Sequence, residues 1–406
     1  MFKEIITRDN LEKAYLKLAE QMEADGRSGR YAGYDGLKLG DLEVNSSKLI
    51  KEARREMIAF KELSPAVLFT IPKKNNPQKL REIYIYNLKE RVKAQAIYQI
   101  VEPYFDAYFS EWLFSYRSSH QSYFAARSVV RHYKKYHSRD YALVADLTDY
   151  SNYISPKILL KKIEKLNFEK PVYKLLKLFI GNKIIKNGEI SNREEGIIQG
   201  VPLVALFNNL YLDDFDKYCG PRADFYRRVG DDLIIFDQDK NRLQPLYEHL
   251  VATASELGLK INEKKTKLGR ADDIFNFLGY NFNHGEIGLE PGFLKQMLKR
   301  WSSQFDFYRA NNIKRKKDFF KKTLKRERNN LYEQFKQIAE QKKLVTKSAE
   351  IIAISETFFH ILTRYFFGTY TPKNRRLLNA ELKNIPFVSI YKHFLSSQYV
   401  DRPKKN

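Results

Sequence analysis

Three aspartates are the residues of this chain best suited to catalysis. Asp146 ends an apolar run, and Asp231 and Asp232 follow about 85 residues later as an adjacent pair. Adjacent carboxylates at a tight turn repel each other unless a cation lies between them. Oxygen ligands of this kind suit Mg²⁺, which needs few protein ligands when phosphate oxygens complete its shell. Two such ions about 4 Å apart activate a 3′-hydroxyl and stabilise a leaving pyrophosphate. The alternative interpretation is that the pair only shapes a turn, where aspartate is common.

The elements expected around these aspartates alternate between strands and helices. The segment DYALVADLTDY predicts a strand that ends at Asp146, and Ser155-Pro156 predicts the start of a helix. Gly230 with the paired aspartates predicts a hairpin, and residues 241–257 predict a helix. The order strand, helix, hairpin, helix, strand predicts an α+β layer whose sheet is open on one face. Further upstream, VLFTIPKKNNPQKLREIYI predicts two strands around a polar turn.

Length and composition exclude several classes of protein. The 406 residues allow two or three domains. A single cysteine, Cys219, rules out a disulfide framework and a cysteine zinc cluster. No run approaches 18 apolar residues and the N-terminus lacks the pattern of a secretory signal. We therefore expect a cytoplasmic protein with no membrane partner.

The positive charge is concentrated near the C-terminus. The net charge is +23, and the segment from Pro291 to the end contains 26 basic and 9 acidic residues. Within it, apolar residues at helical spacing alternate with a basic face that includes Lys316, Lys317, Lys321 and Lys322. Basic helices with interleaved aromatic residues are typical of nucleic-acid binding. A solvated lysine-rich surface, or attraction to anionic lipid, is the alternative.

A series of motifs in a fixed order resembles the reverse transcriptases of the bacterial group II intron and retron lineage. The resemblance runs from about residue 34 to 282 through GYDG, IPKK, REIYIYNLKERVKAQAI, ADLTDYSNYI, GIIQGVPL, RVGDD, LGLKINEKKTK and FNFLGYNF. It implies an α+β right-hand polymerase with fingers, a ferredoxin-like palm and a helical thumb. The implied domains are an N-terminal extension and fingers (1–138), a palm (139–285, with a finger or helical insert at about 160–195) and a basic helical thumb with the C-terminal region (286–406).

The resemblance also implies an activity and a set of site residues. The implied enzyme is an RNA-directed DNA polymerase that copies an RNA template with dNTPs into a DNA product, using two Mg²⁺ ions or Mn²⁺ in their place. Asp146, Asp231 and Asp232 would be the catalytic metal ligands. The implied nucleotide-binding residues are Lys73, Arg81, Ser151, Gln199, Gly200 and Lys265. The implied nucleic-acid contacts are Arg117, Lys316, Lys317, Lys321 and Lys322.

Several positions depart from the family pattern. Val229 stands where the family has an aromatic residue before the paired aspartates, and Glu90 replaces an aspartate. Ser151 stands where a bulky aromatic residue usually blocks the ribose 2′-hydroxyl. We therefore expect weak selection of deoxyribose unless Tyr150 or Tyr153 substitutes.

The biological setting is inferred by resemblance and elimination. One cysteine is expected to exclude a zinc-type endonuclease, and the roughly 115 residues from Pro291 onward are expected to leave no room for a ribonuclease H domain. The stand-alone members of the lineage include anti-phage defence polymerases, some of which act with a small structured RNA or a second polymerase or effector protein. The alternatives are a retron or intron-type reverse transcriptase that stabilises its own RNA, and a catalytically silent RNA-binding scaffold.

Overall fold

The computed structural model describes residues 1–24, 33–36, 46–73, 76–117, 120, 122–181, 183–192, 195–290, 360, 363–364 and 369–383. The chain divides into two compact units, Met1–Asp273 and Ile274–Asn406. The basic helix predicted for the thumb, with Lys316, Lys317, Lys321 and Lys322, lies outside the described residues. The division into fingers, palm and thumb stays a prediction.

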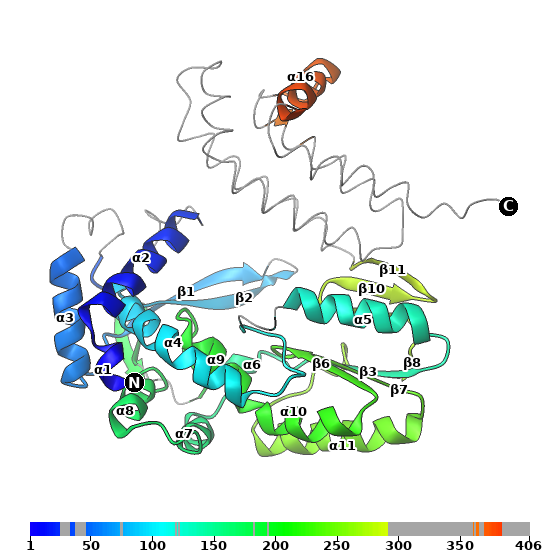
Figure 1. Ribbon diagram of the computed structural model, residues 1–406, viewed down its shortest axis with the longest axis horizontal. Coiled ribbons are helices and arrows are strands. Elements are labelled where there is room, and N and C mark those ends of the chain that lie inside the picture. Colours follow the sequence, from blue (N-terminus) through cyan, green and yellow to red (C-terminus); the bar gives the residue numbers. More distant parts are fainter. Residues whose placement is uncertain are drawn as a thin grey trace. The chain divides into compact units, whose positions relative to one another are not determined.

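The first sheet of the N-terminal unit is built around a long hairpin (Figure 1). The elements that lead to it and follow it are α1 (Phe2–Ile5), α2 (Arg8–Ala24), α3 (Ser46–Ile58), β1 (Ala66–Lys73), β2 (Asn76–Ile85), α4 (Leu88–Tyr108) and α5 (Ser122–Tyr136). Strands β1 and β2 are antiparallel, which confirms the two strands predicted around the polar turn. Strand β1 also pairs in parallel with β4 (Lys183–Lys186), and β5 (Glu189–Asn192) completes the order β2-β1-β4-β5.

The second sheet has the strand order expected of the predicted palm. Its elements are β3 (Tyr141–Ala145), α6 (Tyr150–Tyr153), α7 (Pro156–Glu164), α8 (Lys170–Leu178), α9 (Leu203–Tyr211), α10 (Asp213–Cys219), η2 (Gly220–Arg222), β6 (Phe225–Val229), β7 (Asp232–Asp237), α11 (Lys240–Glu256) and β8 (Lys267–Arg270). The strands are antiparallel in the order β6-β7-β3-β8. With helices between the first and second strands and between the third and fourth, this is a ferredoxin-like βαββαβ layer.

Both faces of this second sheet are buried, so the expectation of one open face is wrong. Helices α10 and α11 cover one face (Figure 1), where residues such as Leu143 and Ile235 join their apolar side chains. On the other face, the Phe236 ring stacks on His132 of α5, with centroids 4.8 Å apart. Helix α5 precedes the sheet in the chain and presents an apolar stripe that includes Val129 and Tyr133. Helix α5 therefore covers the second face of the sheet. The order of elements after residue 140 could not indicate this, because α5 lies before that residue.

Two local sequence signals are confirmed in this unit. Helix α7 begins at Pro156, and the Ser155 hydroxyl accepts a hydrogen bond from the Ile158 backbone amide. Strands β6 and β7 form a hairpin in which Val229 lies opposite Asp232. The intervening turn contains Gly230 with φ +66°, a conformation that glycine adopts without steric cost.

The described part of the second unit is small. It contains β9 (Phe275–Phe277), β10 (Tyr280–Asn283), β11 (Glu286–Leu289) and α16 (Pro372–Lys383). The three strands form an antiparallel sheet in which the rings of Phe275 and Phe282 stack with centroids 4.7 Å apart. In the part of the chain that is described, no helix is both long and apolar enough to cross a membrane.

Candidate active site

The three predicted aspartates lie together at one end of the second sheet. The pairing of β3 with β7 places Ala145 opposite Leu233, so the next position places Asp146 beside Asp232. Asp146 is only 8% exposed, and Asp231 and Asp232 are half-buried at the β6–β7 turn. Antiparallel pairing thus joins carboxylates that are 85 residues apart in the sequence.

Burial, and after it the repulsion between the carboxylates, raises the pKa values in this cluster. Burial, together with the charges of Asp231 and Asp146, raises the pKa of Asp232 from 3.8 to about 7. Burial and the charge of Asp146 also raise the pKa of Asp231. The three carboxylates therefore carry less than their full negative charge at neutral pH unless a cation joins them.

One cationic side chain already contacts the cluster. Lys265 Nζ lies 3.0 Å from Asp146 Oδ1, and Asn262 Nδ2 donates to Asp146 Oδ2 at 2.8 Å. The segment is held there by backbone pairing, because Asn262 N donates to Asp146 O at 2.8 Å. Burial alone would lower the pKa of Lys265, but its hydrogen bond to Asp146 and the charges of the aspartates raise it. Lys265 is therefore a fixed positive charge beside the three carboxylates.

The carboxylate oxygens of the site suit Mg²⁺ but do not complete its coordination shell by themselves. Among the described residues, no group of three or more His, Cys, Asp or Glu side chains is arranged to hold a metal ion by itself. Asp146 has both carboxylate oxygens occupied by Asn262 and Lys265. Mg²⁺ is usually bound by one or two carboxylates together with substrate phosphates and water. A metal at this site would therefore depend on phosphate oxygens from a substrate.

Tyr116 lies within electrostatic range of both Arg81 on the predicted finger hairpin and Asp231, and the sequence reasoning did not include it among the site residues. It is exposed, and its backbone is left-handed with φ +54°, which is uncommon for an aromatic residue. Burial of its hydroxyl and the charge of Asp231 raise the pKa of Tyr116, whereas the charge of Arg81 lowers it. Arg81 is exposed on β2, and Lys73 is the last residue of β1, with a side chain outside the described ones.

A cavity of about 580 Å³ lies beside Tyr116. Its lining residues are Tyr98, Tyr116, Arg117, Ser122, Val201, Pro202 and Ala205. Two of these directly follow the predicted Gln199-Gly200 motif. The volume is of the size that holds a small organic ligand.

Gly200 is required by the fold itself. A Cβ at this position would lie 2.7 Å from the Tyr84 carbonyl oxygen of β2, and φ is +119°. Any larger residue would clash with backbone, so glycine here lets the loop lie against the finger hairpin. Gln199 beside it is half-buried.

Ser151 is held away from solvent in the structure. It is 8% exposed, and its hydroxyl accepts a hydrogen bond from Asn208 Nδ2 at 3.0 Å. The adjacent Tyr150 is also buried and donates its hydroxyl to the Asn208 carbonyl at 2.7 Å. Tyr153 is half-buried, and Lys260 Nζ lies 4.5 Å from its ring centroid.

Arg117 makes its contacts inside the protein. Its guanidinium bonds the Asp106 carboxylate at 2.5 Å and the backbone carbonyls of Ser110, Leu113 and Asp106. The residue is 8% exposed. These contacts favour a structural role that fixes the segment 110–117, and the expected contact with nucleic acid stays a prediction.

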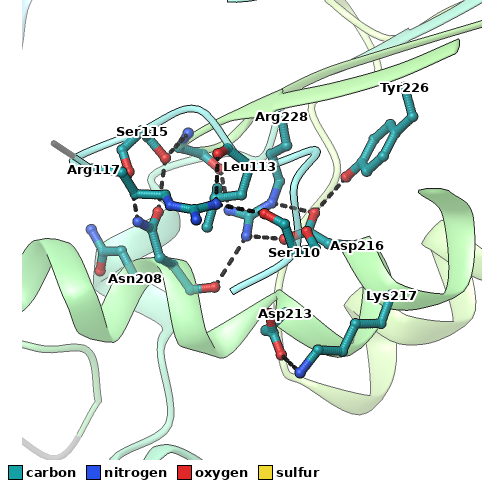
Figure 2. Close-up of polar contacts among 12 residues, drawn as sticks. Ser110, Leu113, Ser115, Arg117, Asn208, Asp213, Asp216, Lys217, Tyr226 and Arg228 are labelled. Atoms are coloured by element: carbon teal, nitrogen blue, oxygen red, sulfur yellow. Dashed lines mark hydrogen bonds and ion pairs between the residues drawn. The ribbon is translucent and has the colours of Figure 1, made fainter. Parts of the chain in front are cut away.

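Sequence reasoning also missed a buried polar network beside the β6–β7 turn (Figure 2). Arg228 and Asp216 are both 0% exposed and form a bidentate ion pair. Figure 2 shows the Tyr226 hydroxyl directed at the same Asp216 carboxylate, at 2.6 Å. A charged residue in a strand is normally exposed, so the sequence offered no signal for this pair.

The comparison with known families agrees with the motifs. A family model described as "Reverse transcriptase (RNA-dependent DNA polymerase)" matches residues 71–282, which is more than half of the chain. The chain belongs to the reverse transcriptase family. The matched range contains all three aspartates, the finger hairpin from Ile71 onward, Gln199-Gly200 and Lys265. The domain is that of an RNA-dependent DNA polymerase, and the family acts on an RNA template and nucleotides.

Two more distant similarities accompany this reverse transcriptase match. Protein YkfC of Escherichia coli (strain K12) is 23% identical over 310 residues, which are 66% of this chain and 79% of YkfC. A solved structure of telomerase from Candida albicans with the TWJ fragment of telomeric RNA is 14% identical. The alignment covers 89% of this chain and 71% of the telomerase chain, with a TM-score of 0.45.

Proposed function

We propose that this reverse transcriptase extends a primer on an RNA template by two-metal nucleotidyl transfer at Asp146, Asp231 and Asp232. The observation that carries the proposal is the convergence of these three carboxylates at the ends of β3 and the β6–β7 hairpin. The raised pKa of Asp232 supports it, because burial and the charges of Asp231 and Asp146 disfavour the ionised carboxylate, and a bound cation would offset both effects.

The chemistry assigns a task to each part of the site. Mg²⁺, when bound, activates the primer 3′-hydroxyl and stabilises the pyrophosphate that leaves as the new phosphodiester bond forms. Asp146, Asp231 and Asp232 would hold the metal through their oxygens. Lys265, 3.0 Å from Asp146, would add positive charge where charge develops on the phosphates.

The nucleotide would lie between the finger hairpin and the aspartates. Arg81 is exposed on β2 and supplies a cation for the triphosphate. Tyr116 interacts electrostatically with both Arg81 and Asp231, which supports a place between them for the incoming nucleotide. Lys73 at the end of β1 and Gln199 beside Gly200 would contact the nucleotide and the template. The thumb lysines at 316, 317, 321 and 322 would hold the nucleic-acid backbone.

The anti-phage role rests on the sequence resemblance alone. A retron or intron-type function shares the same chemistry and differs in the RNA that the protein binds. A catalytically silent RNA-binding scaffold is the competing class. The carboxylate cluster weighs against it, since repelling aspartates contribute no stability that a scaffold would need.

The test is a double Asp231→Asn, Asp232→Asn variant compared with wild type. We expect nucleotide incorporation on a primed RNA template to be lost, with RNA affinity and the circular dichroism spectrum retained. Full activity in the double variant would overturn the assignment of the catalytic residues. Sequencing the nucleic acid that copurifies with the wild type would separate the retron, intron-type and defence alternatives.

A further inference from the structure

The β6–β7 turn that carries Asp231 is held from behind through both backbone polar groups of Gly230. Gly230 N donates to Ser115 Oγ at 2.9 Å, and Gly230 O accepts from Arg228 Nη1 at 2.8 Å. Asp231 is the next residue, so the direction of its carboxylate follows the orientation of this peptide. Two side chains, Arg228 from the same hairpin and Ser115 from 115 residues upstream, thus set the position of a proposed metal ligand.

Ser115 is itself fixed by a reciprocal pair of hydrogen bonds. Its hydroxyl donates to Asn209 Oδ1 at 2.8 Å, and Asn209 Nδ2 donates to the Ser115 carbonyl at 2.7 Å. Both residues are buried, with exposed fractions of 3% and 0%. The Ser115 hydroxyl therefore presents its acceptor side to Gly230, because its proton is committed to Asn209.

Arg228 anchors the other side of the turn. Its guanidinium bonds the Asp216 carboxylate through Nε at 2.7 Å and Nη2 at 2.5 Å, and Nη2 also donates to the Asn209 carbonyl at 3.0 Å. Burial alone would lower the pKa of Arg228, but Asp216 raises it, so the guanidinium stays charged. A bidentate pair of this kind fixes the orientation of the guanidinium plane.

The segment before Ser115 is joined to the same strand. Phe114 N donates to Arg228 O at 2.8 Å, and Arg228 N donates to Trp112 O at 3.0 Å. Arg117 holds the far end of the segment through Asp106 and the Ser110 carbonyl. Hydrogen bonds therefore join the segment 110–117 to strand β6 and to the turn at Gly230, and this network restrains the turn.

We propose that Ser115, with Asn209 and the Arg228–Asp216 pair, is a positioning device that orients the Asp231 carboxylate for metal binding. The inference rests on the proposed function, since it assigns to Asp231 the role of metal ligand. None of the four side chains needs to touch substrate. A displaced metal ligand lowers metal affinity and reaction rate together, whereas reduced stability lowers only the fraction of active enzyme.

Ser115→Ala is the central variant, and Ser110→Ala is its matched control. Ser110 lies in the same segment and is 8% exposed, and its hydroxyl has no hydrogen-bond partner among the described residues. Three quantities are measured on the full chain. They are deuterium exchange of the peptide containing Gly230, the Mg²⁺ concentration that gives half of the Mg²⁺-induced rise in Tm, and kcat and KM for dNTP. Ser115→Thr, which keeps the hydroxyl, is measured alongside.

In Ser115→Ala we expect exchange at the turn to be faster and the half-saturating Mg²⁺ concentration to rise about tenfold. We expect kcat to fall about 10- to 100-fold while KM for dNTP changes little. Ser110→Ala and Ser115→Thr should match wild type. If Ser115→Ala fails to fold, Asn209→Ala, which releases the Ser115 hydroxyl, should show the same shifts.

Wild-type Mg²⁺ affinity and turn exchange in a folded Ser115→Ala or Asn209→Ala variant would overturn the inference. Equal losses in Ser110→Ala would overturn it too, because packing and not the hydrogen bond would be responsible. Asp231→Asn separates the two proposals. If it is inactive while Ser115→Ala behaves as wild type, only the positioning role fails; if it is fully active, the proposed site fails.

Discussion

Replacing Asp232 with asparagine should stabilise the metal-free protein at neutral and alkaline pH while abolishing catalysis. The pKa of Asp232 rises from 3.8 to about 7 in the folded protein, mainly through burial and the charges of Asp231 and Asp146. At about 1.4 kcal/mol per pH unit, this difference corresponds to about 4 kcal/mol of destabilisation when the carboxylate is ionised. Asparagine has nearly the same shape and no charge, so it removes the repulsion. We expect a gain of about 1–4 kcal/mol at pH 8, since neighbouring groups relax around the wild-type charge.

The stability difference between the Asp232→Asn variant and the wild type should depend on pH. Between pH 4 and pH 7 the folded protein binds the Asp232 proton more tightly than the unfolded chain does, so wild-type stability falls as the pH rises. The advantage of the asparagine variant should be small at pH 4 and reach its full value above pH 7. Tm is measured by differential scanning fluorimetry at pH 4, 6 and 8 in EDTA, and again with Mg²⁺. Added Mg²⁺ should raise Tm in the wild type more than in the variant, because only the wild type has all three carboxylates.

An exposed aspartate supplies the control for this experiment. The Asp9 side chain on α2 is 75% exposed and forms a surface ion pair with Lys13. Asp9→Asn should change the stability by less than about 1 kcal/mol at every pH. The reasoning would be refuted if Asp232→Asn were no more stable than wild type at pH 8, or if its advantage were equal at pH 4 and pH 8.

Four further outcomes follow from the structure and the sequence. Glu56→Gln should destabilise the protein by up to about 3 kcal/mol at pH 7. Burial alone would raise the pKa of Glu56, but its hydrogen bonds to Lys93 and Lys89 lower it to about 2. The stabilisation in the wild type should therefore be lost as the pH falls from about 4.5 to 2, which urea unfolding at several pH values would measure. Gly200→Ala should lower the stability by at least about 1 kcal/mol in thermal melts, because the added Cβ meets backbone and φ is +119°. If Ser151 is an open sugar gate, Ser151→Phe should sharpen selection for deoxynucleotides. If Tyr150 takes over the gate, Tyr150→Ala should relax that selection. An unchanged ratio of ribonucleotide to deoxynucleotide incorporation in both variants would exclude a role for either residue. Replacing the predicted thumb lysines with glutamate should weaken RNA binding and flatten its dependence on salt concentration. The residues to replace together are Lys316, Lys317, Lys321 and Lys322. An unchanged salt dependence would contradict a binding role for them.

The sequence by itself determined the features that depend on near neighbours. The start of α7 at Pro156, the β1–β2 hairpin and the turn at Gly230 all follow from residues within a few positions of one another. The ordered motifs also indicated the family, because each keeps its spacing within a short segment. The order of strands and helices after residue 140 indicated an α+β layer, whereas the ferredoxin-like arrangement was implied by the family resemblance and is seen in the strand order β6-β7-β3-β8.

Only the tertiary structure decided how distant segments support these motifs. Ser115 and Gly230 are 115 residues apart, and Asn209 and Ser115 are 94 apart, so no local pattern connects them. Arg228 is a charged residue in a strand, and only the fold reveals that Asp216 makes its complete burial tolerable. Helix α5 covers the second face of the sheet from a position earlier in the chain. Hydrophobic spacing specifies which face of an element is buried, but the partner of each polar group depends on the folded arrangement of the whole chain.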